Sequence, residues 1–135
     1  MTAAGRDRAV RPRRERTVRE LLGSIVLGFE VVIVFLGSLV VYGLHALPTG
    51  LALGGGAALI VLMIVAVGLL RSPMGIVLGW LAQLVVVAAG FLVPAFFIVG
   101  AVFTAIWTYC MIAGARIDRA KNAAHAAERT ETENP

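Results

Sequence analysis

Charged residues are scarce in this sequence, and they are almost absent from its middle. They make up 15% of the chain, and between Glu30 and Arg116 the only one is Arg71. Hydrophobic residues make up 59%, and the mean hydropathy is +0.90. A soluble domain of 135 residues needs far more polar side chains to cover its core. The composition therefore excludes an ordinary soluble protein and predicts an integral membrane protein.

Cysteine and histidine are also rare. The one cysteine, Cys110, excludes an internal disulfide, and its position in an apolar run is typical of a small packed thiol. The two histidines, His45 and His125, lie far apart, so the sequence predicts no metal site. It contains no Ser/His/Asp set, no phosphate-binding loop and no dinucleotide fingerprint. We therefore expect no enzymatic activity and no cofactor.

Long apolar runs predict four membrane-spanning helices. The runs are broken by "HALPTG" at 45–50, by "RSPMG" at 71–75, and by a turn between Gly90 and Pro94. The last break is needed because an uncharged helix from 74 to 115 would be about 63 Å long, roughly twice the thickness of the hydrocarbon core. The predicted fold class is an all-α, four-transmembrane-helix bundle, with helices at about 21–44, 51–70, 74–92 and 94–115.

All 12 lysines and arginines fall on one side of this arrangement, either before the first helix, at Arg71 or after the fourth helix. The positive-inside rule makes that side the cytoplasm and predicts a plasma-membrane protein with both termini cytoplasmic. The chain then divides into an Arg-rich tail (1–18), a membrane domain (19–118) and a polar tail (119–135) that starts as a short helix and ends disordered. We expect no nucleic acid as a partner. The residues expected to set topology and contact anionic lipid headgroups are Arg11, Arg13, Arg14, Arg16, Arg19, Arg71, Arg116 and Arg119.

A single acidic residue, Glu30, lies near the middle of the first predicted helix, close to the bilayer midplane. An ionised carboxylate facing lipid is costly, so we expect a protonated acid or a polar neighbour. Gln83 and Thr104 lie at a similar depth in the third and fourth helices. The sequence therefore predicts a midplane polar cluster of Glu30, Gln83 and Thr104. In this cluster protonated Glu30 donates a hydrogen bond to the Gln83 carbonyl or to the Thr104 hydroxyl, and the Gln83 amide donates back.

Small residues predict where the helices approach closely. Gly23 and Gly37 share a face of the first helix with Glu30, while Gly75 with Gly79 and Gly100 with Thr104 form small-xxx-small pairs. The run Gly54–Gly56 leaves two interpretations open, close packing or a locally unwound binding segment. The aromatic residues at both ends of the helices are interpreted as interfacial belts: Tyr42, Phe96 and Phe97 on the outer side, and Trp80, Trp107 and Tyr109 on the inner side.

Three segments carry a resemblance to a known family: "RELLGSIVLGFEVVIVFLG" with Glu30, "GIVLGWLAQ" with Gln83, and "GFLVPAFFIVGAVFTAIWTYCMIAGARID", which ends at Asp118. Over about residues 14–120 the chain resembles a family of small integral membrane proteins of unknown function from actinobacteria. The genes of that family often lie beside the folylpolyglutamate synthase gene. The resemblance implies a four-span membrane protein and no established activity.

Three candidate functions follow from these features. The first is a non-enzymatic, membrane-embedded packing or partner-binding protein, associated with a second copy or another membrane protein because four short helices enclose little interior. The alternative is a small proton-coupled transporter in which Glu30 exchanges a proton for a cation. A third option is a channel whose pore forms between protomers.

Overall fold

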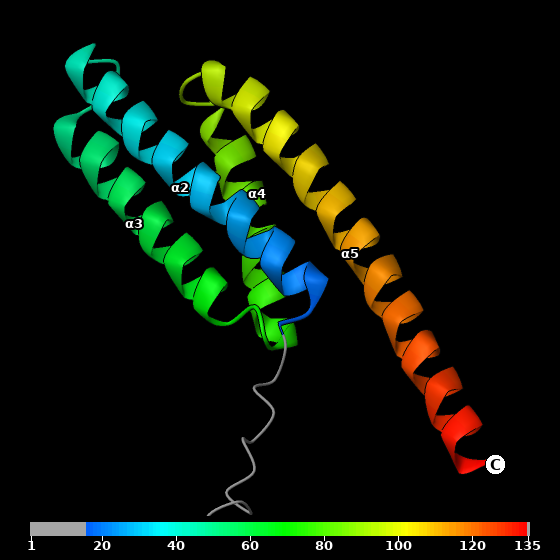
Figure 1. Cartoon of the computed structure of the whole chain (residues 1–135). Coiled ribbons are helices and arrows are strands. Elements are labelled where there is room, and N and C mark those ends of the chain that lie inside the picture. The colour runs from blue at the N-terminus through cyan, green and yellow to red at the C-terminus, as the bar shows by residue number, and fades with distance from the viewer. Residues whose placement is uncertain (1–15, 135) are drawn as a thin grey trace, which may run out of the picture.

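The computed structural model describes residues 16–134, and within them the chain forms four α-helices and no strand (Figure 1). The all-α, four-helix class is thus confirmed. By length and composition, three of the helices can cross a membrane. The remaining one, Pro73–Ala89, has 17 residues and lies at the lower limit for a span. Arg11, Arg13 and Arg14 lie outside the described residues. The helices are α2 (Val18–Gly43), α3 (Thr49–Gly68), α4 (Pro73–Ala89) and α5 (Ala95–Glu133).

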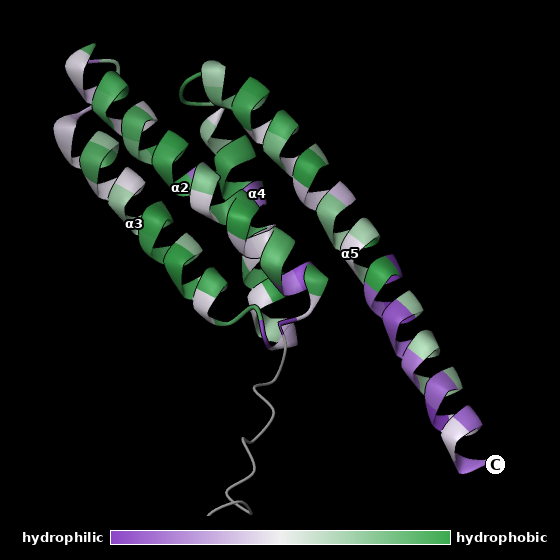
Figure 2. Ribbon diagram, viewed as in Figure 1, coloured by the Kyte–Doolittle hydropathy of each residue, from purple (hydrophilic) through white to green (hydrophobic). Residues whose placement is uncertain are grey.

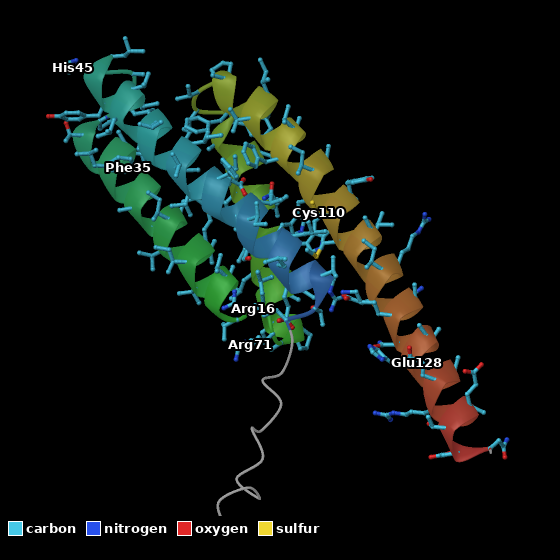
Figure 3. The ribbon with its side chains drawn as sticks, in the orientation of Figure 1. Arg16, Phe35, His45, Arg71, Cys110 and Glu128 are labelled. Atoms are coloured by element: carbon cyan, nitrogen blue, oxygen red, sulfur yellow. The ribbon has the colours of Figure 1, made fainter. Side chains whose placement is uncertain are left out.

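The four helices form an antiparallel bundle in which each packs mainly against two others. Helix α2 packs against α3 and α5, and α4 packs against the same two helices from the other side. One end of the bundle, the hairpin end, carries the α2–α3 and α4–α5 connections (Figure 1). The opposite end, the terminal end, carries Thr17, the α3–α4 connection at Arg71, and the start of the polar part of α5. His45 lies at the tip of the hairpin end, and Arg16 and Arg71 lie at the terminal end (Figure 3).

The helix boundaries follow local capping chemistry. Helix α2 begins three residues before the predicted Leu21, because the hydroxyl of Thr17 accepts a hydrogen bond from the Glu20 N–H at 3.2 Å. Helix α4 begins at Pro73, whose missing N–H costs nothing at the first helical position. It ends at Ala89, three residues before the predicted position 92. The chain then tightens into i→i+3 hydrogen bonds, such as Leu92 N–H to the Ala89 carbonyl at 3.0 Å.

Helix α5 is much longer than its predicted span. The polar tail was expected to begin as a short helix and end disordered, whereas the structure continues α5 without interruption to Glu133. Residues 116–133 contain no glycine or proline and are rich in alanine, arginine and glutamate, which have high helix propensity. Figure 2 shows the change along α5 from hydrophobic to hydrophilic residues as it leaves the bundle. From Arg119 onward its described side chains are exposed.

The interior is small, and the outer surface is strongly apolar, as expected for a bundle surrounded by lipid. Leu27, Met63 and Val86 are fully enclosed, whereas large side chains such as Phe29 point outward. Trp107 corrects the interfacial-belt interpretation for that residue, because its ring is completely buried, whereas Tyr109 is exposed. The physical reason is that Trp107 faces the bundle axis rather than the interface. Cys110 is a buried free thiol.

Candidate functional site: a midplane polar cluster

Three helices contribute the polar residues of the bundle interior. Glu30 lies about 18 Å along α2 from Val18, near the middle of that helix. Gln83 comes from α4 and Thr104 from α5. Glu30 is 0% exposed and Gln83 is 1% exposed, while Thr104 is half-buried. The structure therefore brings together the three residues that the sequence placed at one depth, and we call them the midplane cluster.

A hydrogen-bond chain joins the three side chains. The Thr104 hydroxyl donates to the Gln83 side-chain carbonyl at 3.3 Å, and the Gln83 amide nitrogen donates to Oε2 of Glu30. These are the only hydrogen bonds between two side chains within residues 16–134. The chain differs from the expected network, because Glu30 donates a hydrogen bond to neither the Gln83 carbonyl nor the Thr104 hydroxyl. The Gln83 carbonyl accepts from Thr104 instead, so Thr104 is linked to Glu30 only through Gln83. Each link joins a different pair of helices, so the chain connects α2, α4 and α5.

One oxygen of the acid lacks a protein partner. Oε1 of Glu30 is buried without a hydrogen bond from the described residues, and so is the indole N–H of Trp107. No described cation forms a salt bridge with Glu30. An ionised carboxylate here would be a buried charge without a counter-ion, which is costly. The neutral acid fits the geometry better, with Oε2 accepting from Gln83 and the proton carried on Oε1.

All five predicted packing glycines lie against other parts of the bundle. A Cβ at Gly75 would overlap the Leu69 backbone, and one at Gly79 would overlap the Trp107 ring. At Gly100 a Cβ would lie 3.0 Å from the Val87 Cα. The contacts of the other two glycines are with flexible or aromatic side chain ends: Gly23 with Met111, and Gly37 with Phe96. The cluster thus lies in a bundle whose helices approach closely at glycine.

A second polar contact, at the terminal end, was not predicted from the sequence. The Asp118 carboxylate of α5 accepts hydrogen bonds from the backbone N–H groups of Val18, at 2.9 Å, and Arg19, at 3.3 Å. These are donors that the first turn of α2 cannot satisfy internally. Gly114, one turn before Asp118, makes room, because a Cβ there would lie 2.7 Å from the Arg19 Cα. The available signal was an acid directly after the last span, which suits the positive end of a helix.

The predicted headgroup-binding arginines that the structure describes gather at the terminal end. Arg16 and Arg71 line one hollow of about 230 Å³ together with Glu20. Arg116 and Arg119 are exposed on α5, and Arg19 is half-buried at the start of α2. This end therefore carries the positive charge of the described bundle, while the hairpin end carries none.

Comparison with known proteins gives a family and no function. A search of curated proteins and a search of solved structures returned no match. Residues 20–123 match a protein family described as "Protein of unknown function (DUF4233)". The matched segment includes the whole midplane cluster and Asp118, and it covers most of the chain. The chain therefore belongs to the DUF4233 family.

Proposed function

We propose that this protein is a non-enzymatic, membrane-embedded packing or partner-binding protein of the plasma membrane, with both termini in the cytoplasm. The hydrogen-bond chain from Thr104 through Gln83 to Glu30 carries this proposal. It pairs one polar side chain from each of α2, α4 and α5 and so links these three helices at one depth. In hydrocarbon such polar contacts favour one arrangement of helices, because no water is present to form hydrogen bonds with an unpaired polar group.

The placement of Glu30 supports a structural role for the acid. Its side chain is 0% exposed, and the Gln83 amide already occupies one carboxyl oxygen. A solute entering between α4 and α5 would meet Gln83 and Thr104 first, because both line a groove of about 470 Å³ that Glu30 does not line. Direct exchange of a proton for a cation at Glu30 would therefore require the Gln83 contact to break.

The apolar exterior supports a role in association. Phe29, Ile98 and Tyr109 are each more than half exposed, and no described helix covers them. We propose that lipid covers part of this surface and that a second copy or another membrane protein covers the rest. Arg16 and Arg71, on one hollow at the terminal end, support contact with anionic lipid headgroups.

A proton-coupled transporter remains the second candidate, and one observation favours it. Oε1 of Glu30 is buried without a protein partner, so it could hold an exchangeable proton. The two functions make different demands on Glu30. Packing needs a hydrogen-bond acceptor for Gln83, whereas proton coupling needs a group that ionises.

Glu30→Gln separates the two functions, because it keeps an acceptor for Gln83 and cannot ionise. In mixed detergent micelles, the free energy of unfolding of the purified variant should lie within about 0.5 kcal/mol of that of the native chain. Gln83→Leu leaves the Glu30 carboxyl group without a hydrogen-bond partner, and its free energy of unfolding should fall by about 1–2 kcal/mol. In vesicles with a pH gradient, neither the native chain nor Glu30→Gln should accumulate tetraphenylphosphonium, used as a probe cation. Uptake by the native chain that disappears in Glu30→Gln would favour the transporter and contradict the packing proposal.

The association part of the proposal is tested separately by the mass of the intact complex. After purification in mild detergent, the particle should contain either more than one 14.2 kDa chain or a second membrane protein. A single chain carrying only lipid and detergent would contradict it.

A further inference from the structure

A crevice lies between α2, α3, α4 and the first turn of α5, in the half of the bundle nearer the hairpin end. Its volume is about 310 Å³. Helices α3 and α4 meet at their connection near Arg71 and diverge toward the hairpin end, which opens the space between them (Figure 1). On α2 its lining starts at Val34, one turn beyond Glu30, and it reaches Leu47 in the connection to α3. The crevice therefore extends from near the midplane toward the surface of the bilayer at the hairpin end.

The lining of the crevice is almost purely hydrocarbon. Its one polar side chain is Ser38, whose hydroxyl donates to the Val34 carbonyl at 2.8 Å. No charged side chain contributes to the lining. Water or a polar solute would lose its own hydrogen bonds on entry and find none offered by these side chains. The occupant must therefore be apolar.

Small residues create this space and leave it unfilled. Ala52 and Gly55 of α3 face Ala88 and Ala89 of α4 across the crevice. In membrane bundles small residues usually let two helices touch. Here a Cβ added at Gly55 meets no atom within 4 Å, so the glycine borders open space. Of the run Gly54–Gly56 only Gly56 packs closely, against Ser38, and α3 continues through all three without unwinding.

Shape decides between the apolar occupants that a membrane offers. A helix is a rigid rod about 10 Å wide, and it would need α3 and α4 to stand apart along its whole length, whereas the two helices meet near Arg71 (Figure 1). A helix of a second copy can therefore cover the opening but cannot lie within the crevice. An acyl chain is narrow and flexible, and it already surrounds the bundle at this depth. It would restore the van der Waals contacts that an unfilled space forfeits.

We infer that the crevice binds one acyl chain of a phospholipid from the leaflet at the hairpin end. The lipid thereby acts as a wedge between the α2–α3 and α4–α5 hairpins. This inference rests on membrane insertion, as the proposed function does, but it does not depend on the role of Glu30. The acyl-chain site and the packing role of Glu30 can therefore each be disproved while the other stands.

Photo-crosslinking tests the inference. The full chain is reconstituted into phosphatidylcholine vesicles containing a small fraction of phosphatidylcholine with a diazirine in one acyl chain. After irradiation, peptide mass spectrometry should find labelling of the crevice lining several-fold above that of the outward-facing Ile98 and Val102. The lining residues to compare are Gly55, Gly56 and Leu59 on α3 and Val85, Ala88, Ala89, Leu92 and Val93 on α4 and its connection to α5. Equal labelling of both groups, as expected if a second copy covers the crevice and excludes lipid, would overturn the inference.

Two variants that fill the crevice from opposite walls complete the test. Gly55→Phe from α3 and Ala89→Leu from α4 should each abolish the enrichment. Gly54→Phe is the matched control, because Gly54 also has open space for a Cβ but does not line the crevice. It should keep the enrichment of the native chain. Circular dichroism and elution volume identify any variant that fails to fold. Enrichment that persists in a folded crevice-filling variant would contradict binding at this site.

Discussion

Trp107 is the largest side chain that the bundle encloses completely. It lies one turn from Thr104 on α5, and its ring rests on Gly79, which lies one turn from Gln83 on α4. The ring therefore fills the layer next to the hydrogen-bond chain. We therefore expect its volume to limit how closely α4 and α5 approach at this layer.

Gly79→Ala should be strongly destabilising for a one-carbon change. The added Cβ would overlap the Trp107 ring, and overpacking of this kind costs about 1–3 kcal/mol. The loss is measured as the change in unfolding free energy in mixed detergent micelles. Gly28→Ala is the control, because a Cβ at Gly28 meets no atom within 4 Å. This variant should leave the free energy of unfolding unchanged or raise it by up to about 1 kcal/mol, since alanine has the higher helix propensity. Equal changes in the two variants would show that Trp107 does not occupy this place.

At the scale of single elements, the two ends of α2 are held by different devices. The first turn is held by Thr17 and by Asp118 of α5. The last turn closes with the Ala46 N–H bonded to the Val41 carbonyl and the His45 N–H bonded to the Tyr42 carbonyl. This is the Schellman arrangement, and it places His45 in the left-handed region at φ 53°. One end thus depends on another helix, and the other depends only on local backbone conformation.

Asp118→Ala should loosen the first turn of α2. It removes the acceptor for the Val18 and Arg19 N–H groups, and losing such a cap costs about 0.5–2 kcal/mol. Hydrogen exchange should therefore accelerate at these two amides while the middle of α2 keeps its protection. Glu131→Ala, at an exposed position near the end of α5, should leave the exchange pattern unchanged. Unchanged protection of both amides in Asp118→Ala would contradict the cross-helix cap.

His45→Gly should stabilise the chain. A left-handed conformation costs a residue with a Cβ about 1–2 kcal/mol, and glycine avoids that cost while losing some of the gain to its greater freedom in the unfolded chain. The expected net gain is about 0.5–1 kcal/mol in the same unfolding measurement. Leu44→Gly, one residue earlier in right-handed conformation, should instead be destabilising. A loss in His45→Gly would mean that its contact with the Tyr42 ring outweighs the backbone effect.

At the scale of the whole molecule, charge separates the two ends of the bundle. Arg16, Arg71 and Arg119 lie toward the terminal end, while His45 is exposed at the hairpin end. Helix α5 extends the terminal end further, as a polar rod beyond the packed bundle (Figure 2). A bundle of this kind is oriented by its cations, so the direction of insertion is a property of the molecule rather than of any one helix.

Labelling of single cysteines should reveal this orientation. With Cys110 replaced by alanine, His45→Cys should react with a membrane-impermeant maleimide on intact cells. Ala126→Cys, on the exposed part of α5, should react only after the membrane is permeabilised. The opposite pattern would place the termini outside. Labelling of both positions on intact cells would contradict a complete four-span insertion.

The sequence by itself determined the features that depend on position along the chain. The lengths of the apolar runs and the proline and glycine breaks indicated four helices, and the constant rise per residue placed Glu30, Gln83 and Thr104 at one depth. The prediction for the end of α5 was too short, because the polarity of residues 119–135 favoured disorder in that prediction. The helix propensities of the same residues favour the helix that the structure shows as far as Glu133.

Only the tertiary structure decided the features that depend on rotation about each helix axis and on the neighbour met there. It turned Trp107 inward, set the order of hydrogen bonds through Gln83, and brought Asp118 to the start of α2. It also left Gly55 beside an open crevice while Gly56, its neighbour, packs against Ser38. Adjacent residues of a helix point about 100° apart, so their different surroundings are set by how the helices pack and not by their order in the chain.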